Sequence, residues 1–185
     1  IYDFPIFYFP IFSHPDPTVK RRSGVLMPSL TDSKNLGTGI AIPYYRALAK
    51  DKDITFTPRI YTSENPLLLT EYRQAFKNSY LILDTGITPG YKKTTAKKST
   101  GSKSHFFSQF EMNLAEDSEK ISNVQVKLQK VSNDTYLKIY DINTALADKD
   151  VNVLENSINY NYQNKDLFFG ATISAFDNLT KEDRS

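Results

Sequence analysis

Residues 53–62 read DITFTPRIYT, and this stretch sets the expectation for the fold of the whole chain. Its even positions carry Ile54, Phe56, Pro58 and Ile60, whereas aspartate, threonine and arginine occupy most of the odd positions. A two-residue period of this kind is typical of a β-strand with one apolar and one polar face. The stretch therefore predicts a strand that lies between two different environments.

The same two-residue period recurs along the chain from about residue 38 onward, and helical spacing is nowhere sustained. With one further strand before it, the pattern predicts about nine strands. They are expected at residues 25–30, 38–47, 53–62, 67–76, 80–90, 104–114, 121–131, 152–163 and 167–177. Each strand should pair antiparallel with the next. The predicted fold class is all-β, an antiparallel up-and-down meander.

The connections between the predicted strands differ in length. Short turns are expected at residues 48–52, 77–79, 115–120 and 164–166, and long polar loops at residues 91–103 and 132–151. Outer-membrane barrels have one rim of short turns and one rim of longer loops. Predicted strands of about 10 residues also suit a tilted crossing of a bilayer, because globular strands average about 5 to 6. A soluble β-sandwich would show the same alternation, so the pattern leaves both architectures open.

The composition of the 185 residues narrows the possible functions. The chain has no cysteine and two histidines, which leaves little for a disulfide, a thiolate centre or a zinc site. A formal net charge of +2 without a basic stripe gives no indication of nucleic-acid binding. Residues 4–12 are the richest apolar stretch, and two prolines interrupt it, so no transmembrane helix is expected. No catalytic or phosphate-binding motif occurs, and we expect neither an enzyme nor a cofactor or metal.

Three segments in the N-terminal part resemble a known family. They read FPIFYFP at residues 4–10, KRRSGVLMP at residues 20–28 and IPYY at residues 42–45. Their order and spacing are similar to those of the lipopolysaccharide-assembly outer-membrane protein family LptD, also called organic solvent tolerance protein. The resemblance implies an internal fragment of a larger protein. Residues 1–24 would end a periplasmic jelly-roll-like domain and connect it to the barrel, and residues 25–185 would form the first strands, about nine, of a large transmembrane β-barrel.

This resemblance also implies a function and partners. The family transports lipopolysaccharide to the outer leaflet of the Gram-negative outer membrane, through a lateral gate near the first barrel strands. The implied partners are lipopolysaccharide, outer-membrane lipids, the plug lipoprotein LptE and the periplasmic bridge protein LptA, with no nucleic acid. The chain would lie in the outer membrane with its N-terminal residues on the periplasmic side. Two alternatives stay open: another outer-membrane barrel, such as a porin or a transporter, and a soluble antiparallel β domain that binds a ligand.

Pro28 and Pro43 fall within the first two predicted strands. Proline has no N–H, so each one removes a possible hydrogen bond between neighbouring strands. We predict that the two prolines weaken the sheet at this place and contribute to the lateral gate. The alternative is that they only end or bend strands.

Lys20, Arg21, Arg22, Ser23 and Gly24 stand where the resemblance places the entry to the barrel. Guanidinium groups pair well with phosphate, so the basic side chains could contact lipid phosphates or other acidic groups. The alternative is a structural anchor between two domains, in which Gly24 allows a tight entry of the chain. Both interpretations stay open from the sequence.

Overall fold

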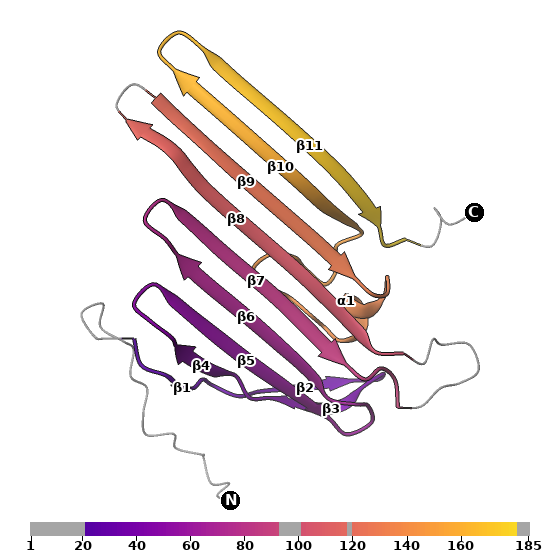
Figure 1. Cartoon of the computed structure of the whole chain (residues 1–185). Helices are drawn as coiled ribbons and strands as arrows, with labels where there is room; N and C mark the ends of the chain where they lie inside the picture. The colour runs from indigo at the N-terminus through magenta and orange to yellow at the C-terminus, as the bar shows by residue number, and fades with distance from the viewer. Residues whose placement is uncertain (1–20, 93–100, 118–119, 181–185) are drawn as a thin grey trace, which may run out of the picture.

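The structure is a computed structural model, and it describes residues 21–92, 101–117 and 120–180. Lys20 and the segment 1–19 lie outside the described residues. The described residues form one antiparallel sheet of eleven strands and one short helix (Figure 1). The elements are β1 (Gly24–Val25), β2 (Ser29–Ser33), β3 (Gly37–Ala41), β4 (Tyr44–Ala47), β5 (Lys52–Tyr61), β6 (Leu67–Ala75), β7 (Ser79–Thr88), β8 (Lys103–Asp117), β9 (Lys120–Val131), α1 (Tyr136–Ile139), β10 (Val153–Asn164) and β11 (Phe168–Asn178).

From β5 to β11 each strand pairs with the next one along the chain, as the sequence predicts for an up-and-down meander. The predicted all-β antiparallel fold class is therefore confirmed. The first two predicted strands are each divided: residues 25–30 become parts of β1 and β2, and residues 38–47 become β3 and β4. Both β3 and β4 pair with β5, so they are two halves of one interrupted strand.

The sheet has two faces of opposite character. Directly paired residues share a face, and one row across β7 to β11 consists of apolar side chains only: Leu81, Phe110, Val126, Ile158 and Ile173. Ile158 and Ile173 are 50% and 75% exposed, so among the described residues this part of the apolar face is left uncovered. The alternation that DITFTPRIYT predicts is thus a property of most of the sheet.

Polar side chains on the other face bind one another across strands. The neighbouring row runs through Glu111, Gln125, Asn159 and Thr172 on β8 to β11. Gln125 Nε2 donates to Glu111 Oε1 at 2.8 Å, and Thr172 Oγ1 donates to Asn159 Oδ1 at 2.8 Å. Polar side chains that hydrogen-bond one another across strands suit a water-exposed face better than a lipid-facing or buried apolar face.

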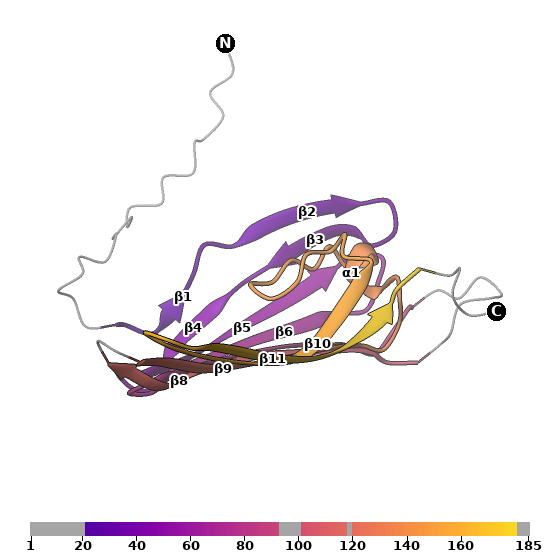
Figure 2. The ribbon, with the colours of Figure 1, turned by 90° about the horizontal axis from the view of Figure 1, so that it is seen from above.

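Residues 132–152, which include α1, fold back over the polar face; we call them the inner segment (Figure 2). The sequence marks this stretch as a long polar loop, but three of its large side chains, Tyr136, Tyr140 and Ile142, are fully buried against the sheet. Beneath it, His105 Nε2 lies 2.6 Å from Asp84 Oδ1, and the His105 ring contacts the Tyr136 ring at 5.6 Å between centroids. The hydrophobic core of the described chain therefore lies between the inner segment and the sheet.

Within the described ranges, no helix is both long enough and apolar enough to pass through a membrane.

Candidate functional site

The candidate site is the first hairpin, residues 24–47, which forms one edge of the described sheet. Its near half pairs β1 with β4 through two residue pairs, Gly24 with Tyr45 and Val25 with Tyr44. Its far half pairs β2 with β3 through five consecutive residue pairs. Between the halves, residues 26–28 face only residues 42–43, which makes a β-bulge with one extra residue in the first strand.

Both proline residues predicted from the sequence lie at this bulge. Pro43 accepts a hydrogen bond from the Leu26 N–H at 2.8 Å through its carbonyl, but it has no N–H to return. The proline positions explain why the first two predicted strands are divided in the structure. A role in opening stays a prediction.

Pro58 adds a third proline on the neighbouring strand β5. Its carbonyl accepts from the Ile42 N–H at 3.1 Å, and again the return bond is missing because proline has no N–H. Pro28, Pro43 and Pro58 therefore lie at the same level on three neighbouring strands; we call them the proline row. The two-residue period marks Pro58 only as an apolar residue of a regular strand, so the sequence pattern does not single it out. A proline inside a predicted central strand was the available signal.

The chain bends at the proline row. Figure 2 shows β2 standing above the plane of β5 and β6, on the side of the sheet that carries α1. A bulge bends its strand and increases the local twist, and missing ladder bonds make the bend less costly. The two halves of the first hairpin thus differ in direction as well as in pairing.

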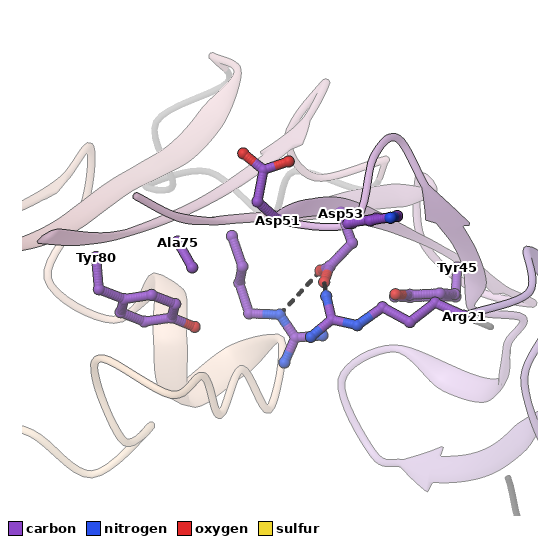
Figure 3. Close-up of a pocket in the computed structure, with 8 residues that line it drawn as sticks. Arg21, Tyr45, Asp51, Asp53, Ala75 and Tyr80 are labelled. Carbon is purple, nitrogen blue, oxygen red and sulfur yellow. Dashed lines mark hydrogen bonds and ion pairs between the residues drawn. The ribbon is translucent and has the colours of Figure 1, made fainter. Parts of the chain in front are cut away.

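Arg21 fastens the start of the hairpin to the sheet. Its Nη1 donates to Asp53 Oδ2 at 2.8 Å, and Arg73 Nε donates to Asp53 Oδ1 at 3.0 Å (Figure 3). Asp53 is only 4% exposed, so one buried carboxylate on β5 binds two guanidinium groups, one before β1 and one on β6. We call these three residues the arginine clasp. The basic motif at residues 20–22 marks Arg21 in the sequence but not its partners, because Asp53 and Arg73 come together only through the register of β5 and β6.

The other residues of the entry motif make local contacts. Ser23 Oγ accepts a hydrogen bond from the Ala47 N–H at 3.0 Å, and Gly24 begins β1. Arg22 is exposed. These contacts are of the kind that a structural anchor requires, whereas phosphate binding stays a prediction.

A cavity of about 330 Å³ lies beside the arginine clasp (Figure 3). It is lined by charged and phenolic side chains and one alanine: Arg21, Tyr45, Lys50, Asp51, Asp53, Arg73, Ala75 and Tyr80. These side chains make the cavity suited to polar and charged groups rather than to apolar ones. Over the described ranges, no group of three or more His, Cys, Asp or Glu side chains is arranged to hold a metal ion.

The fold and site together define a class: an antiparallel β-meander with one apolar face, one polar face and a creased first hairpin. Known proteins of similar sequence agree on a narrower assignment. The chain is 31% identical over 178 residues to an LPS-assembly protein LptD of Cupriavidus pinatubonensis, an alignment that covers 96% of this chain and 20% of that protein. It is 28% identical over 170 residues to LPS-assembly protein LptD of Nitrosococcus oceani, covering 88% of this chain and 20% of the relative.

A shorter alignment gives higher identity. LPS-assembly protein LptD of Psychrobacter cryohalolentis is 41% identical over 78 residues, which are 42% of this chain and 8% of that protein. No family model matches the chain. The chain belongs to the LPS-assembly protein LptD family, as the resemblance predicts, and it spans about one fifth of the length of the relatives that it matches along most of its own length.

Proposed function

We propose that the chain forms part of the wall of an outer-membrane β-barrel that delivers lipopolysaccharide to the outer leaflet. The alignment of nearly the whole chain with proteins named for lipopolysaccharide assembly carries the proposal. The two faces of the sheet support it physically. A membrane-spanning strand needs an apolar side chain toward lipid and can place a polar one toward a watery interior.

The proposal assigns different places to the two parts of the chain. Residues 25–185 belong to the barrel, and residues 1–24 end a periplasmic jelly-roll-like domain and connect it to the barrel. The N-terminal residues then lie on the periplasmic side, and the short turns of the sheet lie on the same side. The arginine clasp would hold the connection at this rim, close to where the first barrel strand begins.

The first hairpin is the proposed lateral gate, with Pro28 and Pro43 as its weak points. Each missing ladder bond costs about 0.5 to 1.5 kcal/mol in water, and an unpaired group costs more in lipid. Pro58 adds a third missing donor on β5, the strand that pairs with the second strand of the hairpin. A sheet edge that is already weakened here needs less free energy to part.

The remaining partners follow from the family. Lipopolysaccharide and outer-membrane lipids would contact the barrel, the plug lipoprotein LptE would fill its interior, and the bridge protein LptA would dock on the periplasmic domain. The proposed activity moves a lipid without making or breaking a bond, so it requires neither a catalytic residue nor a cofactor.

The test is the full-length protein with Pro28→Ala and Pro43→Ala together, which restores two backbone donors. We expect slower appearance of lipopolysaccharide at the cell surface, because the seam becomes better bonded. Pro66→Ala is the matched control, since Pro66 lies in the turn before β6 and outside the proline row. Unchanged surface lipopolysaccharide in the double variant would sink the gate hypothesis.

Two further outcomes would favour the alternatives. Depletion of the protein that lowers solute uptake but leaves surface lipopolysaccharide unchanged would point to a porin or a transporter. A full-length protein that stays in solution without detergent would point to a soluble ligand-binding domain.

A further inference from the structure

The far half of the first hairpin packs against the inner segment, although about one hundred residues of chain separate them. Leu36, in the turn between β2 and β3, is 3% exposed and belongs to the same core cluster as Tyr136 and Tyr140. The turn of an edge hairpin is normally a solvated place. Here its apolar side chain is instead buried in a cluster that includes side chains of the inner segment.

Arg59 connects the inner segment to β5, the strand with which the far half pairs. It lies on β5, paired with Ala41 of β3 and next to Pro58. Its Nη1 donates to the Tyr140 carbonyl at 2.9 Å and to the Asp141 carbonyl at 3.0 Å. The last carbonyls of a helix lack partners within the helix, so a guanidinium group at this position binds groups that α1 leaves open.

Tyr61 completes the stack between β3 and the inner segment. Its ring lies 6.2 Å from the Tyr140 ring, between centroids. On the other side, a Cβ atom at Gly39 would come within 2.7 Å of the Tyr61 ring. Gly39 therefore lets the ring lie directly over β3, and the inner segment rests on that ring.

The contact between the two regions is not a continuous packed layer. A cavity of about 270 Å³ lies in it, lined by the far half of the hairpin, by Arg59 and Tyr61 and by the residues around the end of α1. A few specific contacts, rather than a large apolar area, hold the far half and the inner segment together.

We propose that Arg59 and Leu36 couple the inner segment to the far half of the first hairpin and to residues 59–61 of β5 that pair with it, so that these parts move as one body hinged at the proline row. The near half, held by its two residue pairs and by the arginine clasp, belongs to the other side of the hinge. Arg59 is a positioning residue in this scheme. If the hairpin is the lateral gate, opening of its far half must displace the inner segment, but the coupling itself does not depend on what is transported.

The experiment is amide hydrogen exchange of the full-length protein in detergent micelles, without lipopolysaccharide. For Arg59→Gln we expect exchange in residues 132–152 and in residues 29–41 to rise together by about tenfold, because two charge-assisted hydrogen bonds are lost. Exchange in residues 24–25 and 44–47 should stay unchanged. Arg46→Gln is the control, since Arg46 is exposed on β4 and lies outside the contact. A rise confined to residues 132–152 would overturn the proposal.

Two further variants separate coupling from simple loss of stability. Arg59→Lys keeps the charge and should recover part of the protection in both regions. Leu36→Ala acts from the hairpin side, and coupling is reciprocal, so it should loosen residues 132–152 as well. If Leu36→Ala loosens only the hairpin, the two regions are independent and the proposal fails. Leu36→Ala also provides the test if Arg59→Gln does not fold. Because no transport is measured, a wrong transport function would leave these results unaffected.

Discussion

The first and the last hairpins of the sheet have the same topology but very different continuity. In the last hairpin, β10 and β11 pair through eleven consecutive residue pairs, from Val153 with Asn178 to Gln163 with Phe168. In the first hairpin, two residue pairs and five residue pairs are separated by a bulge and by prolines. Two hairpins of one meander can thus serve as a rigid wall and as a creased edge. The difference comes from a few backbone donors rather than from the side-chain pattern.

A proline placed in the last hairpin should give the largest effect. Ile158→Pro removes a ladder donor in the middle of β10, between β9 and β11, and we expect a loss of several kcal/mol of folding free energy in a membrane. The measurement is the urea midpoint of the full-length protein in lipid vesicles. Ile158→Val is the control, because it keeps the ladder and changes one methylene. A midpoint equal to that of the control would show that the continuity of the last hairpin does not matter.

The arginine clasp should give the next largest effect, in the near half of the first hairpin. Asp53→Ala leaves two guanidinium groups without their shared carboxylate, but Arg21 and Arg73 are partly exposed and can turn to water. We therefore expect a local loss of about 2 kcal/mol, less than for a fully buried pair. Faster amide exchange in residues 24–25 and 44–47 reports it. Asp166→Ala, in the turn between β10 and β11, is the control, and equal exchange in both variants contradicts the prediction.

Pro58→Ala should change stability in the opposite direction. It supplies the N–H that can donate to the Ile42 carbonyl and complete the pair between these residues. We expect a gain of about 1 kcal/mol in local stability, read as slower amide exchange of β3 and β4. Pro66→Ala should leave that exchange unchanged. Faster exchange in Pro58→Ala would mean that the bend itself, rather than the missing donor, stabilises this part of the sheet.

The smallest effect concerns pH, and it is absent at neutral pH. Burial raises the pKa of Tyr140 to about 12 from its usual 10.0. If the inner segment were released, the Tyr140 phenol would ionise near pH 10. The stability that buried, neutral Tyr140 gives to the docked inner segment is therefore fully present below pH 10 and falls as the pH rises toward 12. Tyrosinate absorbance is titrated from neutral to high pH and compared between the unaltered protein and Tyr140→Phe. The difference should place the ionisation of Tyr140 near pH 12. A step near pH 10 would show that the inner segment does not bury this phenol.

The strands could be predicted from the sequence because their period is local. Alternation at Ile54, Phe56 and Ile60 already gives the orientation of β5, and Pro28 and Pro43 mark the interrupted part of the first hairpin. Pro58 belongs to the same stretch, where the two-residue period marks it only as one more apolar position. Its effect appears only when its carbonyl and missing N–H are matched with Ile42 of the neighbouring strand.

The inner segment and the arginine clasp could not be predicted in the same way. The bond from Arg59 to Tyr140 spans 81 residues, and that from Arg21 to Asp53 spans 32 residues. Such contacts depend on the register of several strands, and the two-residue period says nothing about them. Residues 132–152 look polar on average, although Tyr136, Tyr140 and Ile142 are buried. The few buried side chains, rather than the composition of the segment, decide its place.

The bulge at residues 26–28 also determines which face of the sheet the side chains on either side of it point to. Val25 pairs with Tyr44, on the apolar face, whereas Ser29 pairs with Ala41, on the polar face, so odd positions change sides across the bulge. If residues 25–30 formed a regular strand without the bulge, either Val25 or Leu30 would point toward the polar side. Deleting one residue from 26–28 would therefore remove the need for the bulge, because a spacing of four residues keeps both side chains on one face of a regular strand. The bulge is the feature that lets this longer stretch keep Val25 and Leu30 on the same side.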